Sequence, residues 1–325
     1  MAIAIRTVNG EEYAEAASVI LRESWPPPSI HYTPEYMRWQ LSFPSTVPAP
    51  AIVALDGDTP VGFCSVTPRR FRASTHSWDS GIVSFVAVRP GWRGRGLSLA
   101  LYHELCGAIK QMGAPILTFG VEGSIGLKVL LQAYTTAGFQ ALPLGGYPSY
   151  VCLAGANAPE PGDWVAERVS QPDALNVFGE ASAGEDSRVI LSYPSELQFQ
   201  HYFRDPRRRD LVLLQNRSTG VRGAAWLVET EFVTANGVDH VASVDLVDIP
   251  GYDPAALPAL FRAAAIWSGK PGPTLVTAPN LGGFPAQSLR QCGIRQTGKG
   301  FMGYCCGVDI PPVLGSARTT NIEIV

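Results

Sequence analysis

The stretch VAVRPGWRGRGLS, from Val86 to Ser98, decides the fold of this 325-residue chain. An apolar strand is expected to end at Val88, because Pro90 lacks the N–H group that a strand ladder uses. A helix is expected to begin near Leu97, where apolar residues start to recur at helical spacing. The stretch therefore predicts a strand, a glycine-rich turn and a helix in direct succession.

The turn itself has the chemistry of an anion site. Gly94 and Gly96 lack Cβ atoms, so the backbone can curl with its N–H groups converging. Those donors and the helix N-terminus suit a pyrophosphate, and Arg93 and Arg95 would add positive charge. The sequence thus indicates a phosphate-binding loop.

Two common phosphate loops do not fit this turn. Gly91 to Ser98 has the spacing of a Walker A loop, but Leu97 stands where that loop needs a lysine. Counted from Gly94, the dinucleotide-binding fingerprint would need a small residue at the position of Leu99. Neither alternative supplies the contacts that its ligand requires.

The stretch resembles the coenzyme A loop of the GNAT acyltransferase superfamily, whose pattern is Arg/Gln-x-x-Gly-x-Gly/Ala after a strand. Here Arg93 and Gly96 match that pattern, and Ser98 replaces the last small residue. The family's Val-x-Pro-x-x-Arg-Gly lead-in and its later Tyr-x-x-x-Gly-Phe motif are matched by residues 88–94 and 134–139. The resemblance covers residues 3–153 and implies an α/β (α+β) fold with a mixed, mostly antiparallel sheet flanked by helices.

The resemblance also implies how the donor, acetyl-CoA or another acyl-CoA, is held. The strand before the loop would pair with pantetheine, and the loop backbone would bind the pyrophosphate. The residues expected to bind the donor are Phe85, Val86, Ala87, Val88, Arg93, Gly94, Arg95, Gly96, Leu97 and Ser98.

Acid and base roles follow from the same resemblance. Tyr134 matches the family's general acid, and a phenol with a pKa of about 10 is protonated at neutral pH; the alternative is a core aromatic. The family's frequent glutamate on the strand before the loop has no counterpart in residues 81–86. Glu122 is therefore the predicted base, with Asp79, His31 and a water chain as alternatives.

An acceptor site is expected in residues 25–41, WPPPSIHYTPEYMRWQL, because aromatic loops often bind ligands. The alternative is that these rings only pack a short helix beginning at Pro34. The predicted acceptor-binding residues are Trp25, His31, Tyr32 and Tyr36.

The second half repeats the order of elements of the first. Gly293-Ile294 stands where Gly138-Phe139 stood, but residues 248–258, DIPGYDPAALP, lack an Arg-Gly-x-Gly turn and carry two aspartates. We therefore expect a GNAT-like domain at residues 1–155, a linker at 156–164 and a degenerate GNAT-like domain at 165–325. The arrangement resembles those of mycothiol synthase and N-myristoyltransferase, where two halves shape one acceptor groove.

Four arginines in the second half form a dense basic cluster. Two acidic neighbours flank them, so a solvent-exposed loop is expected, and contact with an acidic ligand is the alternative. The cluster comprises Arg204, Arg207, Arg208 and Arg209.

Composition narrows the partners. With 25 basic and 28 acidic side chains, the net charge of −3 gives no general attraction for nucleic acid or anionic membranes. No apolar stretch approaches the roughly 20 residues of a membrane span, and the first residues do not read as a signal peptide. The six cysteines form no Cys-x-x-Cys pair, so we expect a cytoplasmic protein with reduced thiols and no metal site.

The expected function is acyl transfer from an acyl-CoA thioester to an amine of a small molecule or peptide by direct attack. A first alternative is a fatty-acyl transferase that lipidates a peptide natural product, with CoA or an acyl carrier protein as donor. A second alternative is a non-catalytic acyl-CoA-binding regulatory module.

Overall fold

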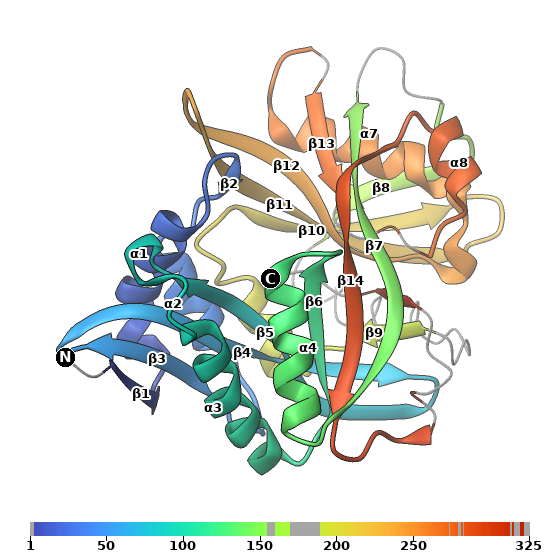
Figure 1. Ribbon diagram of the computed structural model, residues 1–325. Helices are drawn as coiled ribbons and strands as arrows, with labels where there is room; N and C mark the ends of the chain where they lie inside the picture. Colours follow the sequence, from blue (N-terminus) through green and yellow to red (C-terminus); the bar gives the residue numbers. More distant parts are fainter. Residues whose placement is uncertain are drawn as a thin grey trace.

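One continuous sheet runs through the whole molecule, as the computed structural model shows (Figure 1). The described residues are 3–154, 160–169, 189–272, 274–278, 281, 283–312, 314 and 319–321. In order across the sheet, the strands are β1 (Ile3–Val8), β3 (Ala51–Asp56), β4 (Thr59–Ala73), β5 (His76–Val88), β6 (Ile116–Val121), β14 (Arg295–Gly307), β7 (Gln140–Ala154), β13 (Thr274–Ala278), β12 (Gly237–Asp248), β11 (Arg222–Thr234), β10 (Arg209–Asn216) and β8 (Trp164–Arg168). Only β5–β6 and β12–β13 are parallel along this path, which confirms a mixed, mostly antiparallel sheet.

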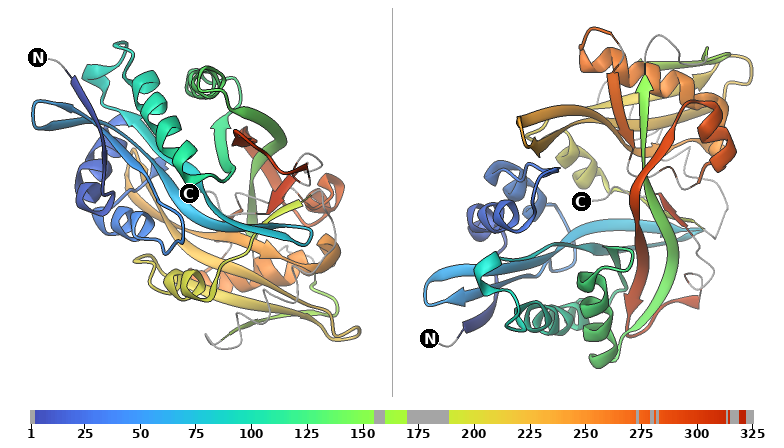
Figure 2. Two further views of the ribbon diagram at one scale, coloured as in Figure 1. Left: turned by 90° about the horizontal axis from the view of Figure 1, so that it is seen from below. Right: turned by 45° about the horizontal axis from the view of Figure 1, so that its top comes forward.

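Helices cover this sheet in layers. The α-helices are α1 (Ala14–Ser24), α2 (Pro34–Leu41), α3 (Leu97–Met112), α4 (Ile125–Thr136), α6 (Glu196–Tyr202), α7 (Leu257–Ser268) and α8 (Ala286–Gln291). Short strands β2 (Ser29–Ile30), β9 (Val189–Ser192) and β15 (Thr319–Asn321) lie off the main path. In Figure 2, α3 and α4 lie on the outer face of the first-half sheet, α1 and α2 lie between the halves, and α7 covers the second half.

Local sequence explains the starts of two helices beside the candidate site. The Thr33 hydroxyl accepts a hydrogen bond from the backbone N–H of Tyr36, and Pro34 occupies the first turn of α2, as the sequence predicts. Ser124 caps α4 in the same way through the N–H of Leu127. These caps fix where α2 and α4 meet the sheet.

A hydrophobic core joins the two halves. Met37 and Trp39 of α2 and Phe63 of β4 belong to the same buried cluster as Tyr202 of α6 and Trp226 of β11. Separate clusters lie beneath α3 and α4 in the first half and beneath α7 in the second. The halves are therefore packed against each other through apolar side chains.

The halves also exchange strands. β14, from the second half, lies between β6 and β7, while β7, from the first half, lies between β14 and β13. Residues 155–159 of the expected linker lie outside the described residues, and Trp164, expected to end it, is 2% exposed and opens β8. The proposed domain limits stay a prediction, but the structure places shared strands across them.

All six cysteines carry free thiols. Among the described helices, none has the length and apolar character needed to cross a membrane. Within the described ranges, the structure has no group of three or more His, Cys, Asp or Glu side chains placed to hold a metal ion.

Candidate functional site

A cleft opens between β5 and β6 in the first half. These parallel strands pair only through Ile82–Leu117 and Val83–Thr118. Just beyond, β5 bulges against β4, and Phe85 adopts a φ of 59°. The separation leaves a cavity of about 330 Å³ whose walls include Ser84, Phe85 and Val86. Because β5 has no β6 partner there, its backbone can pair with an extended ligand.

The glycine turn lies at the end of β5, after a 3-10 turn η2 (Pro90–Trp92). Gly94 and Gly96 have φ angles of 76° and 75°, which glycine adopts without strain. Gly96 is the N-cap of α3 and offers no side chain to the amides of the first turn. A Cβ atom at either glycine would meet nothing within 4 Å, so the turn opens onto free space. An anionic group fits this space and these amides.

The two arginines of the turn hold its backbone. The Arg93 side chain donates from Nε to the carbonyl of Val88 at 3.1 Å and from Nη2 to the carbonyl of Ser24 at 2.5 Å. Arg95 donates to the carbonyl of Gly91 at 3.2 Å. Arg93 therefore joins the end of β5 to the end of α1, and both guanidinium groups remain beside the turn.

Tyr134, the predicted general acid, lies in the core. Its side chain is 0% exposed, and its hydroxyl forms a 2.7 Å hydrogen bond with Thr118 of β6. Burial raises the pKa of the Tyr134 phenol well above its ordinary value, so the group is protonated at neutral pH. The cavity wall includes Leu130, one turn earlier on α4, but not Tyr134. The geometry favours a core position, and the acid role stays a prediction.

The predicted base candidates lie away from both cavities. Glu122 is exposed just after β6, where its N–H donates to the carbonyl of Gly300. Asp79 accepts a hydrogen bond from Thr46, and neither residue lines a cavity described here. Glu122 therefore stays a prediction that the geometry does not favour.

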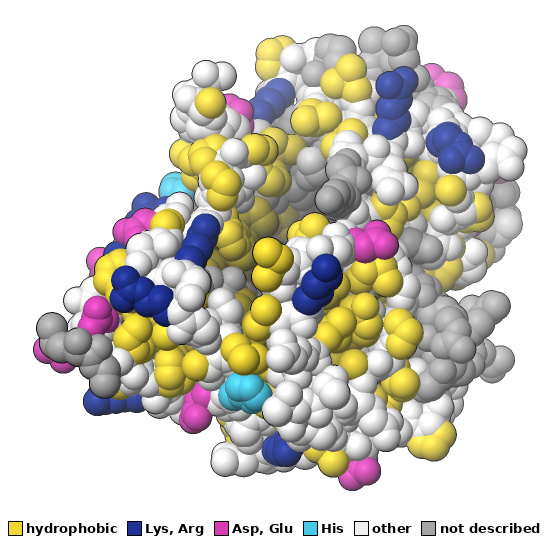
Figure 3. Space-filling view, viewed as in Figure 1, with side chains coloured by type: hydrophobic (Ala, Val, Ile, Leu, Met, Phe, Trp, Pro, Cys, Tyr) yellow, Lys and Arg dark blue, Asp and Glu magenta, His cyan; other side chains and the backbone are white. Residues whose placement is uncertain are grey.

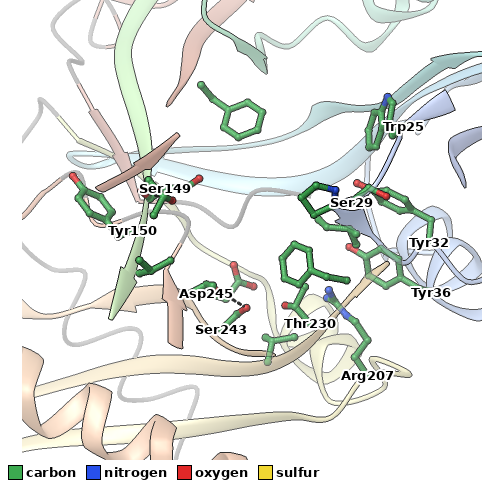
Figure 4. A pocket seen from close by; sticks show the side chains of 18 of the residues that line it. Trp25, Ser29, Tyr32, Tyr36, Ser149, Tyr150, Arg207, Thr230, Ser243 and Asp245 are labelled. Atoms are coloured by element: carbon green, nitrogen blue, oxygen red, sulfur yellow. Dashed lines mark hydrogen bonds between the residues drawn. The ribbon is translucent and has the colours of Figure 1, made fainter. Parts of the chain in front are cut away.

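A second, larger cavity of about 530 Å³ lies between the two halves (Figure 4). Trp25, Tyr32 and Tyr36 line it, as expected from the aromatic segment. His31 does not; its Nδ1 lies 2.7 Å from Glu231 of β11, which joins the segment to the second half. In Figure 3, hydrophobic side chains gather along the hollow between the halves.

The two cavities adjoin. Trp25 of the first half and Phe301 of the second half line both of them. A group that enters from the β5–β6 cleft therefore reaches the larger cavity past these two rings. Phe301 was not expected from the sequence, because β14 reaches this place only through the strand exchange.

The basic cluster departs from its expected solvent-exposed position. Arg207 and Arg209 line the larger cavity, and Asp205 binds both at 2.9 Å. Burial works to raise the pKa of Asp205, but Arg207 and Arg209 outweigh it and lower that pKa. Arg208, in contrast, is exposed and lies over the ring of Trp267. Alternate arginines face inward because β10 begins at Arg209 and strand side chains alternate.

Comparison with known proteins identifies the first half. Residues 14–127 match the family model described as Acetyltransferase (GNAT) family. These residues form a GNAT domain. A search of curated proteins finds no match for the chain.

The GNAT arrangement recurs in solved structures along the whole chain. N-myristoyltransferase of Saccharomyces cerevisiae, with bound myristoyl-CoA and inhibitors, has a TM-score of 0.66 at 11% identity, covering 99% of this chain and 87% of that one. A tandem GNAT protein from the clavulanic acid biosynthesis pathway has a TM-score of 0.62 at 14% identity, covering 95% and 100%. A GCN5-related N-acetyltransferase from Kribbella flavida has a TM-score of 0.56 at 14% identity, covering 93% and 71%. At these identities the likeness shows the fold: a tandem arrangement of two GNAT-like halves.

Proposed function

We propose that this protein transfers an acyl group from an acyl-CoA in the β5–β6 cleft to an amine in the larger cavity. The observation that carries the proposal is the meeting of the two cavities at Trp25 and Phe301. The GNAT domain and the open amides at Gly94 and Gly96 support a CoA donor.

The step is direct attack. The amine nitrogen forms a bond to the thioester carbonyl carbon, the carbon–sulfur bond breaks, the nitrogen loses a proton, and the leaving thiolate gains one. Bulged β5 positions the thioester, while the aromatic walls exclude water from the junction. Tyr134 would protonate the thiolate only through Thr118 or a local movement, because its hydroxyl is bonded to Thr118.

Free thiol release from acetyl-CoA or myristoyl-CoA with a panel of amines tests the proposal. We expect acceptor-dependent thiol release with at least one donor, and mass spectrometry of the product gives the acyl length. CoA binding with no turnover on any acceptor would instead support the non-catalytic module. An acyl carrier protein loaded with the same acyl group tests the carrier alternative in the same assay.

Tyr134→Phe tests the acid role, because it removes the hydroxyl and keeps the ring. If Tyr134 donates the proton, the rate of thiol release falls by about tenfold or more while CoA affinity is unchanged. Thr118→Val, which removes the hydrogen-bond partner, is the matched variant. An unchanged rate in Tyr134→Phe would assign the residue to the core alone.

A further inference from the structure

The second half repeats the donor cleft of the first half, residue for residue, 160 positions later. Pro250-Gly251-Tyr252 corresponds to Pro90-Gly91-Trp92. β12 pairs with β13 only at Ala242–Val276 and Ser243–Thr277, as β5 pairs with β6 only at Ile82–Leu117 and Val83–Thr118. The two half-sheets therefore separate at the same register.

The bulge recurs as well. On β5, two residues, Phe85 and Val86, lie where β4 has only Cys64 between its paired positions. On β12, Asp245 and Leu246 lie where β11 has only Trp226. Asp245 is thus the counterpart of Phe85, and a carboxylate stands where the donor cleft has a phenyl ring.

Asp245 lies in the wall of the larger cavity. The residue is 8% exposed, and it is the one acidic residue among the described residues that line this cavity. Figure 4 shows its carboxylate pointing into the cavity from β12. Arg209 lies on one side, with Nη1 3.2 Å from the carboxylate. A buried carboxylate facing a cavity favours a cationic ligand group there.

Arg207 offers the opposite charge in the same cavity. Its Nε and Nη2 donate to Asp205 at 3.1 and 2.9 Å, while no hydrogen bond to the described part of the chain engages Nη1. The guanidinium carbon lies 4.1 Å from the ring centre of Tyr36. Burial works to lower the pKa of Arg207, but Tyr36, Asp205 and Asp245 outweigh it and raise that pKa. Arg207 is therefore a fixed cation with one nitrogen open to an anion.

We propose that the acceptor is an amine that also carries a carboxylate, an amino acid or short peptide, whose ammonium binds Asp245 and whose carboxylate binds Arg207. Figure 4 places the two charged groups on the same floor of the cavity, with Thr230 between them. The aromatic walls suit the remaining body of such a ligand. This inference rests on the proposed acyl transfer and names its acceptor class.

Calorimetry tests the inference with the full chain, with and without CoA. The probes are phenylalanine, leucine, lysine and glycylphenylalanine, each compared with its own C-terminal amide, and phenylalanine compared with 3-phenylpropanoate. We expect at least one acid to bind about tenfold or more tightly than its amide, because a charged hydrogen bond is lost in the amide. If no acid binds more tightly than its amide, the inference is overturned.

Two variants assign the charges. Arg207→Gln should remove the difference between acid and amide, and Asp245→Asn should weaken phenylalanine about tenfold while leaving 3-phenylpropanoate unchanged. Arg208→Gln and Asp239→Asn, at exposed positions on the neighbouring chain and the same strand, should change neither. An acid–amide difference that survives in Arg207→Gln would contradict the assignment.

The same titrations separate this inference from the proposed function. CoA affinity should be unchanged in Arg207→Gln and Asp245→Asn, because both residues lie outside the donor cleft. Wild-type protein that binds these acids and no CoA would contradict the proposed function and leave the acceptor class supported. Wild-type protein that binds CoA and shows no acid preference would do the reverse.

Discussion

The two crossings from strand to helix, Val88 to Leu97 and Asp248 to Leu257, have the same architecture and opposite chemistry. In the first, Gly94 and Gly96 leave amides facing open space. In the second, the Asp253 carboxylate accepts hydrogen bonds from the N–H of Ala255 at 3.0 Å and from Nε1 of Trp164 at 3.1 Å. The second crossing therefore supplies its own anion, and a phosphate would meet a carboxylate.

The bulges differ in the same complementary way. Phe85 makes the first cleft apolar beside its backbone, whereas Asp245 makes the second acidic and directs it toward the larger cavity. Because the backbone register is the same, side chains alone divide the donor and acceptor roles between the halves. The comparison shows that one fold used twice need not bind one ligand twice.

The largest expected effect comes from separating the halves. A chain of residues 1–154 lacks β14 and β13, so β6 loses one neighbour and β7 loses both. We expect no cooperative thermal unfolding from this fragment, because the core shared with α6 and β11 is also lost. Circular dichroism melting measures this, and co-expression with residues 160–325 should restore the transition. A soluble fragment that melts cooperatively alone would break the idea of shared strands.

The next effect separates the two crossings. Gly94→Asp should reduce CoA-dependent thiol release by about a hundredfold or more, since a carboxylate replaces charged hydrogen bonds to phosphate. Gly251→Asp is the matched control, because Gly251 has a similar φ of 65° in the second crossing. The two substitutions impose similar backbone strain, so equal melting temperatures with unequal rates locate the anion site. Equal loss of activity in both variants would contradict the comparison.

A smaller effect is expected at Asp253. Asp253→Ala should lower the free energy of unfolding by about 1 kcal/mol, the usual cost of losing a helix cap, without changing CoA affinity. Urea denaturation measures the loss, and Asp253→Asn, which keeps an acceptor oxygen, should lose less. Weaker CoA binding in Asp253→Ala would show that the second crossing does hold the cofactor.

The smallest effect is a pH dependence at the junction of the halves. Burial lowers the pKa of His201, whose Nε2 lies 2.9 Å from the carbonyl of Trp39 and whose ring stacks on Trp39. The unfolded chain therefore binds a proton at higher pH than the folded chain does. Stability should fall as the pH drops below about 6.5, by at most about 1.4 kcal/mol per pH unit.

Denaturation at pH 7 and pH 5 measures this slope. His201→Gln should flatten it, and His103→Gln, at an exposed position on α3, should leave it unchanged. A slope that is the same in all three proteins would exclude His201 as its source.

Local patterns predicted the donor side of the site well. The turn at Gly94 and Gly96, the start of α3 at Leu97, and the cap of α2 at Thr33 all depend on neighbouring residues, and the structure confirms their conformations. The repeat of elements in the second half was visible from Gly293-Ile294 for the same reason.

Long-range pairing was hidden from those patterns. The strand exchange brings Phe301 to the cavity junction, and nothing near Phe301 in the sequence indicates its partners. Arg207 reads as solvent-exposed because its acidic neighbour Asp205 is adjacent, yet that neighbour is buried with it. Asp245 would have been found by aligning Pro90-Gly91-Trp92 with Pro250-Gly251-Tyr252 and counting back to the bulge.

The stoichiometry of CoA binding tests the central claim most directly. Because only the first crossing has open amides, calorimetric titration of the full chain with CoA should give about one site per chain. That site should disappear in Gly94→Asp and persist in Gly251→Asp. Two sites per chain, or a site lost in Gly251→Asp and kept in Gly94→Asp, would contradict the account.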